Sequence, residues 1–168
     1  MRNVKYKGKV ITLVTRKRIF PNGYVSRVEI IEHPGAVVIV PFLDLSTVIL
    51  LKQYRPAIDR YLYELPAGTL KPGESVPLCA RRELIEETGF AARKFRRMGQ
   101  IYPVPGYSTE IMTVFKAEGL YPREAEGDPD ELIETRTFSR VQVRRLFRNG
   151  KIKDAKTICG LAFCGWLN

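Results

Sequence analysis

Three closely spaced glutamates carry the chemistry that this sequence suggests first. Glu83, Glu86 and Glu87 are separated by three and four residues, a spacing that places side chains on one side of a helix. Three carboxylates this close repel one another, and such repulsion makes little sense for stability alone. It suits a hard divalent cation such as Mg²⁺, which takes oxygen ligands and bridges to substrate phosphate. A solvated acidic helix face is the alternative interpretation.

A helix that follows Ser75 and stops at Gly89 would position these glutamates. Ser75 is a typical N-cap, Pro77 is tolerated in a first helical turn, and glycine is common where helices end. The residues just before, 68–75, resemble a phosphate-binding P-loop except that Glu74 stands where such a loop needs lysine. A carboxylate there would repel phosphate, which argues against a P-loop.

The spacing over residues 68–90 matches the Nudix box, Gly-x5-Glu-x7-Arg-Glu-U-x-Glu-Glu-x-Gly-U, in which U is an apolar residue. Its defined positions are filled by Gly68, Glu74, Arg82, Glu83, Leu84, Glu86, Glu87, Gly89 and Phe90. The chain therefore resembles the Nudix hydrolases, and a match at every defined position favours this family over a solvated acidic face. The resemblance implies that Glu74 and Arg82 form a structural pair that ties the loop to the helix.

The same resemblance implies a fold, an activity and a metal site. The fold class would be α/β (α+β), an α/β/α sandwich around a mixed sheet. The family cleaves a pyrophosphate inside a nucleoside diphosphate that is linked to another moiety, using Mg²⁺ or Mn²⁺. Glu83 and Glu87 would be the principal metal ligands. Glu86 would join a further metal or orient water, and the carbonyl of Ala67 would complete the coordination.

Outside the box, the chain resembles the ADP-ribose pyrophosphatase branch of this family. Residues 51–56 look like its Gln-Tyr-Arg element, in which Arg55 would contact the diphosphate, and residues 64–68 match its approach to the box. Pro105 stands where that branch typically has a proline, and Glu110 lies in the same segment, so both are candidate substrate-binding residues. The implied reaction is metal-dependent hydrolysis of ADP-ribose to AMP and ribose 5-phosphate.

An acidic segment at residues 124–131 is the expected source of the general base. Relatives often carry four acidic residues in this loop, whereas Pro129 takes one acidic position here. Glu131 is the candidate base, with Asp130 and Glu110 as alternatives. A general base typically contributes about 10²–10⁴ in rate. A solvated acidic turn is the alternative interpretation of each carboxylate.

Two parts of the chain are expected to position the box. Residues 1–34 read as a small β arm with strands near 10–14 and 24–31, and residues 35–168 would form the Nudix hydrolase domain. A meander this small rarely stands alone, so it must pack on the main domain or on a second subunit. ADP-ribose pyrophosphatases commonly pair with exchanged arms, which implies a homodimer with the arm as dimerisation element.

The other expected elements follow from hydrophobic periodicity and capping signals. Strands are predicted at 36–42, 48–51, 61–65, 96–102, 111–117 and 133–138. Ser139 and Gln142 predict a capping box on a helix that ends at Asn149 and Gly150. Asp154 would cap a last helix with Ile158, Leu161, Ala162 and Trp166 on one face. Strands outnumber helices without regular alternation, which indicates a mixed architecture.

Composition excludes several classes of protein. A chain of 168 residues with 45% hydrophobic residues is long enough for one domain with its own core. Its apolar runs fall far short of the ~20 residues that a membrane span needs, and the N-terminus has no apolar signal-peptide core. The three cysteines are an odd number without a Cys-x-x-Cys pair, which predicts neither a disulfide framework nor a zinc site. Cytoplasm is the expected location, with no membrane partner.

Charge leaves the partner open. The chain has 28 Lys and Arg against 18 Asp and Glu, a net charge of +10, which suits an anionic partner or serves solubility alone. A basic face on the final helices, or simply their solvent side, would contain Arg144, Arg145, Arg148, Lys151, Lys153 and Lys156.

Three functions therefore stay open, of which hydrolysis of ADP-ribose is favoured. The second keeps the chemistry but takes another nucleotide sugar such as GDP-mannose, because neither Arg55 nor the box reads the base or the sugar. The third is a basic nucleic-acid-binding module without catalysis. The sequence carries no RRM, KH or zinc-finger signature, and its intact glutamates argue against lost catalysis.

Overall fold

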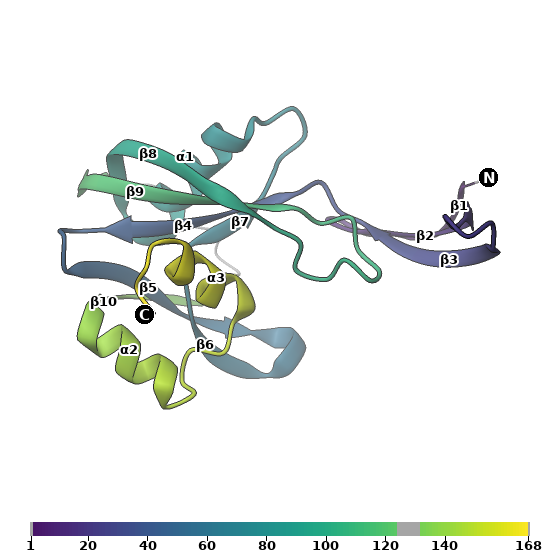
Figure 1. Cartoon of the computed structure of the whole chain (residues 1–168). Helices are drawn as coiled ribbons and strands as arrows, with labels where there is room; N and C mark the ends of the chain where they lie inside the picture. The colour runs from purple at the N-terminus through teal and green to yellow at the C-terminus, as the bar shows by residue number, and fades with distance from the viewer. Residues whose placement is uncertain (1, 124–131, 168) are drawn as a thin grey trace.

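The computed structural model describes residues 2–123 and 132–167, which form two β-sheets, three α-helices and one short 3₁₀ helix (Figure 1). The smaller sheet has the antiparallel order β1-β2-β3, with bounds Arg2–Lys7, Thr12–Ile19 and Val25–Glu32. The larger sheet contains β4 (Ala36–Phe42), β5 (Thr47–Arg55), β6 (Arg60–Glu64), β7 (Ala67–Thr69), β8 (Phe90–Ile101), β9 (Met112–Pro122) and β10 (Ile133–Ser139). The helices are η1 (Pro56–Ile58), α1 (Val76–Thr88), α2 (Arg140–Arg148) and α3 (Ala155–Phe163).

The larger sheet is mixed. Its order is β10-β5-β4-β9-β8, with β6 paired to β5 and β7 paired to β4. The central strands β4 and β9 run parallel, whereas the other pairings described are antiparallel. A chain that leaves β4 must therefore cross over before it returns as β9, and this crossover contains α1. The sheet thus places the box beside its central strand.

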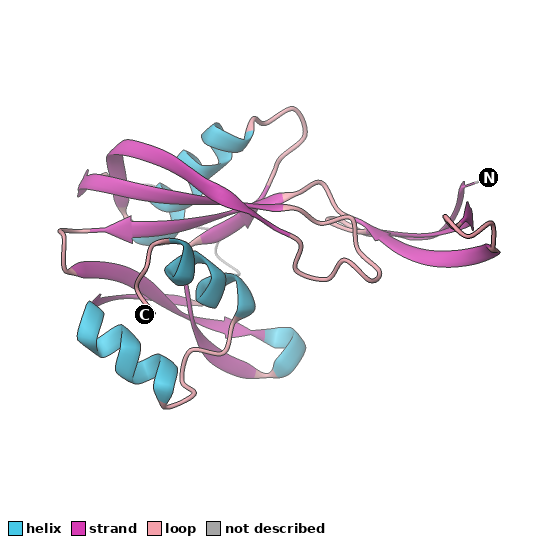
Figure 2. Ribbon diagram, viewed as in Figure 1, coloured by secondary structure: helices cyan, strands magenta, loops and turns pink. Residues whose placement is uncertain are grey.

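Strand β4 explains the layered architecture. It is buried along its whole length, as its continuous apolar run predicts for a strand covered on both faces. Successive side chains of a strand point to opposite faces, and the two faces of β4 enter different cores. Val38 and Val40 pack with residues of α2 and α3, whereas Val37 and Ile39 pack with residues of α1. Helices thus cover both faces of the sheet, which confirms the expected α/β/α sandwich (Figure 2).

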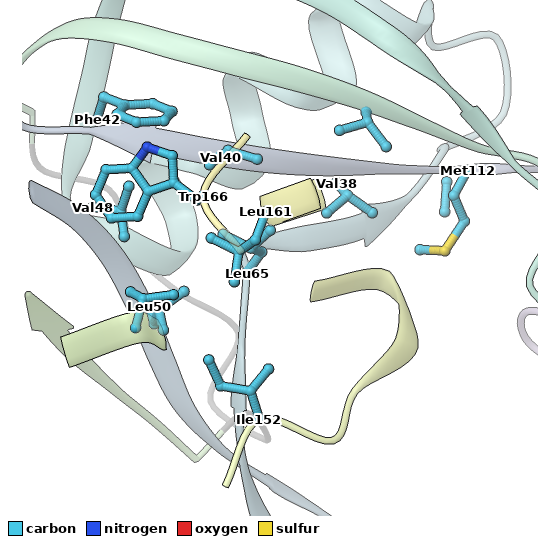
Figure 3. Close-up of a cluster of buried hydrophobic side chains, with 13 residues drawn as sticks. Val38, Val40, Phe42, Val48, Leu50, Leu65, Met112, Ile152, Leu161 and Trp166 are labelled. Carbon is cyan, nitrogen blue, oxygen red and sulfur yellow. The ribbon is translucent and has the colours of Figure 1, made fainter. Parts of the chain in front are cut away.

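The core beneath α3 also contains the chain's C-terminal turn (Figure 3). Trp166 was expected on the last helix, but α3 ends at Phe163 and the chain reverses at Gly165, whose φ is +68°. The indole ring nevertheless packs edge-on against Phe42, with ring centroids 5.2 Å apart. Its burial therefore comes from the turn after the helix.

The local capping signals correspond to the helix ends. Ser139 and Gln142 form the predicted capping box at α2, and the Asp154 carboxylate accepts a hydrogen bond from the amide of Thr157 at α3. Gly89 ends α1 in the left-handed region, with φ +72°. Ser75 occupies the N-cap of α1 with an extended backbone, but its side chain makes no capping hydrogen bond.

Strand boundaries differ most from expectation where pairing is decided by a distant partner. β8 was expected at 96–102 but begins at Phe90, because it is the outer strand beside β9 and its charged residues face solvent. β1 and β7 were not expected. β1 is exposed throughout and carries no buried alternation, and β7 is three residues long. Both form by pairing rather than by a hydrophobic pattern of their own.

The three strands β1 to β3 project away from the larger sheet (Figure 1). The end of β3 is hydrogen-bonded to the segment between β8 and β9, since the amide of Ile31 donates to the carbonyl of Tyr107 at 2.7 Å. The Ile31 carbonyl in turn accepts from the amide of Thr109 at 3.0 Å. In the described residues, no helix is long and apolar enough to cross a membrane.

Removing the buried side chain of Leu161 is expected to destabilise the sandwich. Leu161→Ala leaves a cavity between α3 and β4 and should lower the free energy of unfolding by about 2–5 kcal/mol. Leu45→Ala is the matched control, because Leu45 is 95% exposed and its loss should cost less than about 0.5 kcal/mol. Urea unfolding of both variants measures the difference, and equal midpoints would contradict the placement of α3.

Candidate active site

A cleft of about 820 Å³ opens where α1, β7 and the base of the arm meet. Glu83 and Glu86 of α1 line it, together with Gly68 of β7, Arg55 at the end of β5 and Lys9 between β1 and β2. The cleft therefore brings carboxylates and cations together from segments far apart in the sequence. This is the composition expected of a site that holds a cation and a phosphate together.

The three glutamates occupy different environments on α1. Glu83 and Glu87 are 9% and 7% exposed, whereas the Glu86 side chain is 30% exposed. The amide of Ala67 donates to Glu87 Oε2 at 2.8 Å, which fixes this carboxylate against β7. A Cβ on Gly68 would lie 1.9 Å from the Glu83 carboxylate, so only glycine lets Glu83 lie against the strand. The box glycine thus permits the helix to approach β7.

Arg82 offsets the repulsion within this cluster. Its Nη1 lies 2.7 Å from Glu83 Oε1 and 2.7 Å from Glu86 Oε2. Its Nε and Nη2 donate to the two oxygens of Glu74 at 2.8 and 2.9 Å, a bidentate pair between loop and helix. Hydrogen bonds from Arg82 hold the pKa of Glu74 at about 2, and the same carboxylates raise the pKa of Arg82. One guanidinium therefore connects three carboxylates.

The donor set fits a hard divalent cation. Three carboxylates from five consecutive positions lie on one helix, and the Glu83 carboxylate presses on the backbone at Gly68. Oxygen donors of this kind are what Mg²⁺ and Mn²⁺ take. Within the described residues, no three His, Cys, Asp or Glu side chains are already gathered as a metal site. Glu83 and Glu86 instead bond to Arg82, and Glu87 bonds to the Ala67 amide.

Arg55 lies in the cleft but is held by a buried carboxylate. Its Nε and Nη2 donate to the two oxygens of Glu64 at 2.8 and 2.6 Å, while 38% of its side chain stays exposed. Lys156 of α3 bonds to the same carboxylate. Sequence analysis gave no role to the Glu64 side chain and placed Lys156 on a surface face. No local pattern joins residues 55, 64 and 156, so no signal in the sequence could have found this group.

The remaining site candidates fall into two groups. Pro105 and Glu110 lie in the segment between β8 and β9 and are absent from the described residues that line the cleft. Glu110 reaches the cleft indirectly, because its Oε1 lies 3.8 Å from Nδ1 of His33, which does line it. Asp130 and Glu131 lie outside the described residues. Their expected roles stay predictions.

Comparison with known proteins agrees with this geometry. A family model described as NUDIX domain matches residues 32–160. The ADP-ribose pyrophosphatase of Bacillus subtilis strain 168 is 38% identical over 94% of this chain and 86% of that protein. The methanol dehydrogenase activator of Bacillus methanolicus is 31% identical over the same shares. A crystal structure of an ADP compounds hydrolase has a TM-score of 0.84 and 27% identity, covering 99% of this chain and 91% of that one.

The chain belongs to the Nudix family. The matched region contains the whole box, from Gly68 to Phe90, and the strands that support it. The family resemblance and the fold expected from it are therefore confirmed. The interpretation of Glu83, Glu86 and Glu87 as a merely solvated acidic face is wrong, because two of the three are buried beside the cleft.

The Glu74–Arg82 pair makes the free energy of unfolding depend on pH. The pKa of Glu74 is about 2, below its ordinary value of 4.5, so the pair stabilises the fold fully above 4.5. That contribution is lost as the pH falls toward 2. We expect Glu74→Gln to lower the free energy of unfolding at neutral pH, with the gap from the unsubstituted chain narrowing from about pH 5 downward. Urea unfolding at a series of pH values measures the gap.

Glu134→Gln provides the matched control. Glu134 also pairs with an arginine, Arg136, at 2.7 Å, but its side chain is 55% exposed. Exposed ion pairs contribute little, so this substitution should leave the free energy of unfolding nearly unchanged. A Glu74→Gln gap that stays constant down to pH 3, or one no larger than that of the control, would contradict the prediction.

Proposed function

We propose that this chain hydrolyses the pyrophosphate bond of ADP-ribose, with a divalent metal, to AMP and ribose 5-phosphate. The observation that carries the proposal is the cleft in which Glu83 and Glu86 lie with Arg55 and Lys71. A diphosphate is negatively charged. It can approach the carboxylates only where cations compensate the charge of the diphosphate and that of the carboxylates. Relatives named for ADP-ribose and for ADP compounds support this class of substrate.

We infer that Glu83 and Glu87 would hold Mg²⁺ or Mn²⁺, with Glu86 and the carbonyl of Ala67 as further ligands. Such an ion, when bound, supplies charge neutralisation at phosphoryl oxygens and a lowered pKa for its bound water. Arg82 holds Glu83 and Glu86 near each other against their mutual repulsion. Gly68 lets Glu83 lie close to the backbone next to Ala67.

The other residues of the cleft would bind and orient the substrate. Arg55 donates to the diphosphate, because guanidinium groups present several N–H donors to phosphate oxygens. Glu131 is the candidate base that takes the proton from the attacking water. The oxygen of that water bonds to one phosphorus as the bridging P–O bond breaks, which releases two monophosphates. Pro105 and Glu110 remain candidate contacts to the nucleotide.

The substrate and the metal ligands are tested together by a panel assay. With Mg²⁺ or Mn²⁺ present, we expect ADP-ribose to be hydrolysed faster than GDP-mannose, ADP-glucose, diadenosine polyphosphates and 8-oxo-dGTP. Glu87→Gln should reduce turnover by about 100-fold or more, since losing even a supporting contact of a metal ligand costs about 10–100-fold. Phosphate-product release measures turnover, and calorimetric titration with Mn²⁺ measures metal affinity.

Glu118→Gln is the control for that assay, because Glu118 pairs with Phe42 at the end of β4 and is absent from the described lining of the cleft. It should keep both turnover and Mn²⁺ affinity. Full activity of Glu87→Gln would show that the metal assignment is wrong. Preference for GDP-mannose would keep the metal ligands and replace only the substrate. Binding of polynucleotide without hydrolysis of any compound would favour a nucleic-acid-binding module.

We also propose a cytoplasmic homodimer in which residues 1–34 are the dimerisation element beside the hydrolase domain of residues 35–168. Large apolar side chains of the arm are exposed, among them Tyr6 at 60% and Ile19 at 75%. A three-stranded sheet with so little buried surface gains stability by packing on another surface. Free cysteines are consistent with a reducing compartment.

Substitution of one exposed arm residue tests the dimer without removing the arm. Sedimentation equilibrium of the full chain should give twice the chain mass of 19.2 kDa. Ile19→Asp should shift the mass toward the monomer, because a carboxylate would enter the apolar contact. Leu45→Asp, on a residue that is 95% exposed outside the arm, should not. A monomeric full chain, or a soluble and active monomer lacking residues 1–34, would contradict the dimer.

A further inference from the structure

The carboxylate that holds Arg55 is shared with a second cation. Glu64 is 1% exposed at the end of β6, and both of its oxygens accept from Arg55. Nζ of Lys156, from the first turn of α3, bonds to Oε2 of the same carboxylate. Two cations that are far apart in the sequence therefore meet on one buried charge. Arg55 alone already donates to both oxygens of Glu64, so the contact with Lys156 is additional.

The first turn of α3 is fixed to this part of the sheet by several further bonds. The hydroxyl of Thr157 accepts from the amide of Leu65 at 2.7 Å and donates to Asp154 Oδ2 at 2.6 Å. Lys156 Nζ lies 3.0 Å from the same Asp154 oxygen. A Cβ on Gly160 would lie 2.5 Å from Leu65, so glycine allows the close approach of α3. The contact between the first turn of α3 and Leu65 thus places Lys156 beside Glu64.

Charge explains what Lys156 does for Glu64. Burial would raise the pKa of Glu64, but the bonds to Arg55 and the charge of Lys156 outweigh it and hold the pKa below its ordinary value. Glu64 is therefore ionised at neutral pH. The group holds two cations and two carboxylates, because Lys156 also lies 3.0 Å from Asp154 Oδ2. Lys156 therefore supplies a second positive charge that keeps the buried Glu64 compensated, whatever Arg55 binds.

The geometry of the Arg55–Glu64 pair leaves N–H donors of Arg55 available to a ligand. Glu64 uses Nε and Nη2 of Arg55, and a guanidinium has five N–H donors in a fixed plane. The donors that remain belong to a side chain that is 38% exposed and lines the cleft. If Arg55 shifts toward a phosphate, Lys156 remains as a partner for Glu64, so the buried carboxylate is not left alone. An unpartnered buried charge is strongly unfavourable.

We propose that Lys156 is a positioning residue for substrate binding, acting through Glu64 to keep Arg55 oriented toward the diphosphate. The inference rests on the proposed function, because it assumes that the ligand of Arg55 is a diphosphate. It assigns the C-terminal helix a part in substrate affinity, although α3 contributes no residue to the described lining of the cleft. It concerns affinity rather than the chemical step.

Lys156→Met tests the proposal by separating binding from turnover. We expect the KM for ADP-ribose and the Kd of its α,β-methylene analogue, which cannot be hydrolysed at the bridging atom, to rise about tenfold, the scale of coupling within one salt-bridge network. The kcat should change less than about twofold, since uniform binding alone is lost. Calorimetry gives the Kd, and product release gives the kinetic constants.

Three comparison variants make the result specific. Lys153→Met removes the same charge from an exposed position three residues earlier, and it should leave the Kd unchanged. Lys156→Arg should restore most of the affinity. In a Glu64→Gln background, Lys156→Met should have almost no further effect, because the residue through which it acts has gone.

The outcomes separate this inference from the proposed function. If the unsubstituted chain binds and hydrolyses ADP-ribose but Lys156→Met leaves the Kd within twofold, the inference alone is overturned. An equal loss in Lys153→Met, or a fall in kcat with unchanged KM, would also overturn it. If the unsubstituted chain neither binds the analogue nor hydrolyses ADP-ribose, the proposed function fails and the inference fails with it.

Discussion

Mutual repulsion among the glutamates of α1 is the constraint on which the rest of the site depends. A helix that brings Glu83, Glu86 and Glu87 together gains nothing from their proximity, so other contacts must hold them in place. Ala80 and Leu84 lie on the same buried side of α1 as Glu83 and Glu87, and they pack with Val37 and Ile39 of β4. Arg82 then supplies positive charge where the repulsion is greatest. Hydrophobic packing and one guanidinium therefore maintain an arrangement that electrostatics alone would disperse.

The two arginines that line the cleft have different partners. Arg82 is 20% exposed at its side chain and bonds to carboxylates of the box, so it serves the internal balance of charge. Arg55 is more exposed, and its carboxylate partner is shared with Lys156. The first arginine is bound within the box, whereas the second retains N–H donors for a ligand. A net charge of +10 on the chain is thus less informative than the partners of these two side chains.

The features that could be predicted from the sequence are those that depend on residues close together in the chain. The spacing of the box glutamates, the Ser139–Gln142 capping box and the continuous apolar run of β4 each depend on neighbours in the chain. The strand β7 and the start of β8 depend instead on a partner strand. The Glu64–Lys156 contact spans 92 positions, and nothing near either residue encodes it. Sequence thus predicted that the box carboxylates lie together on one helix, but it did not predict the support of Arg55.

The segment between β6 and β7 joins the two faces of the sandwich. Glu64 and Leu65 at its start are bonded to Lys156 and Thr157 of α3 on one face of the sheet. Two residues later, Ala67 donates to Glu87 of α1 on the other face. The contacts that support Arg55 and the contact that holds Glu87 therefore come from one short stretch of backbone. Because α3 and α1 both bond to this stretch, the support of Arg55 and the placement of Glu87 depend on the same backbone.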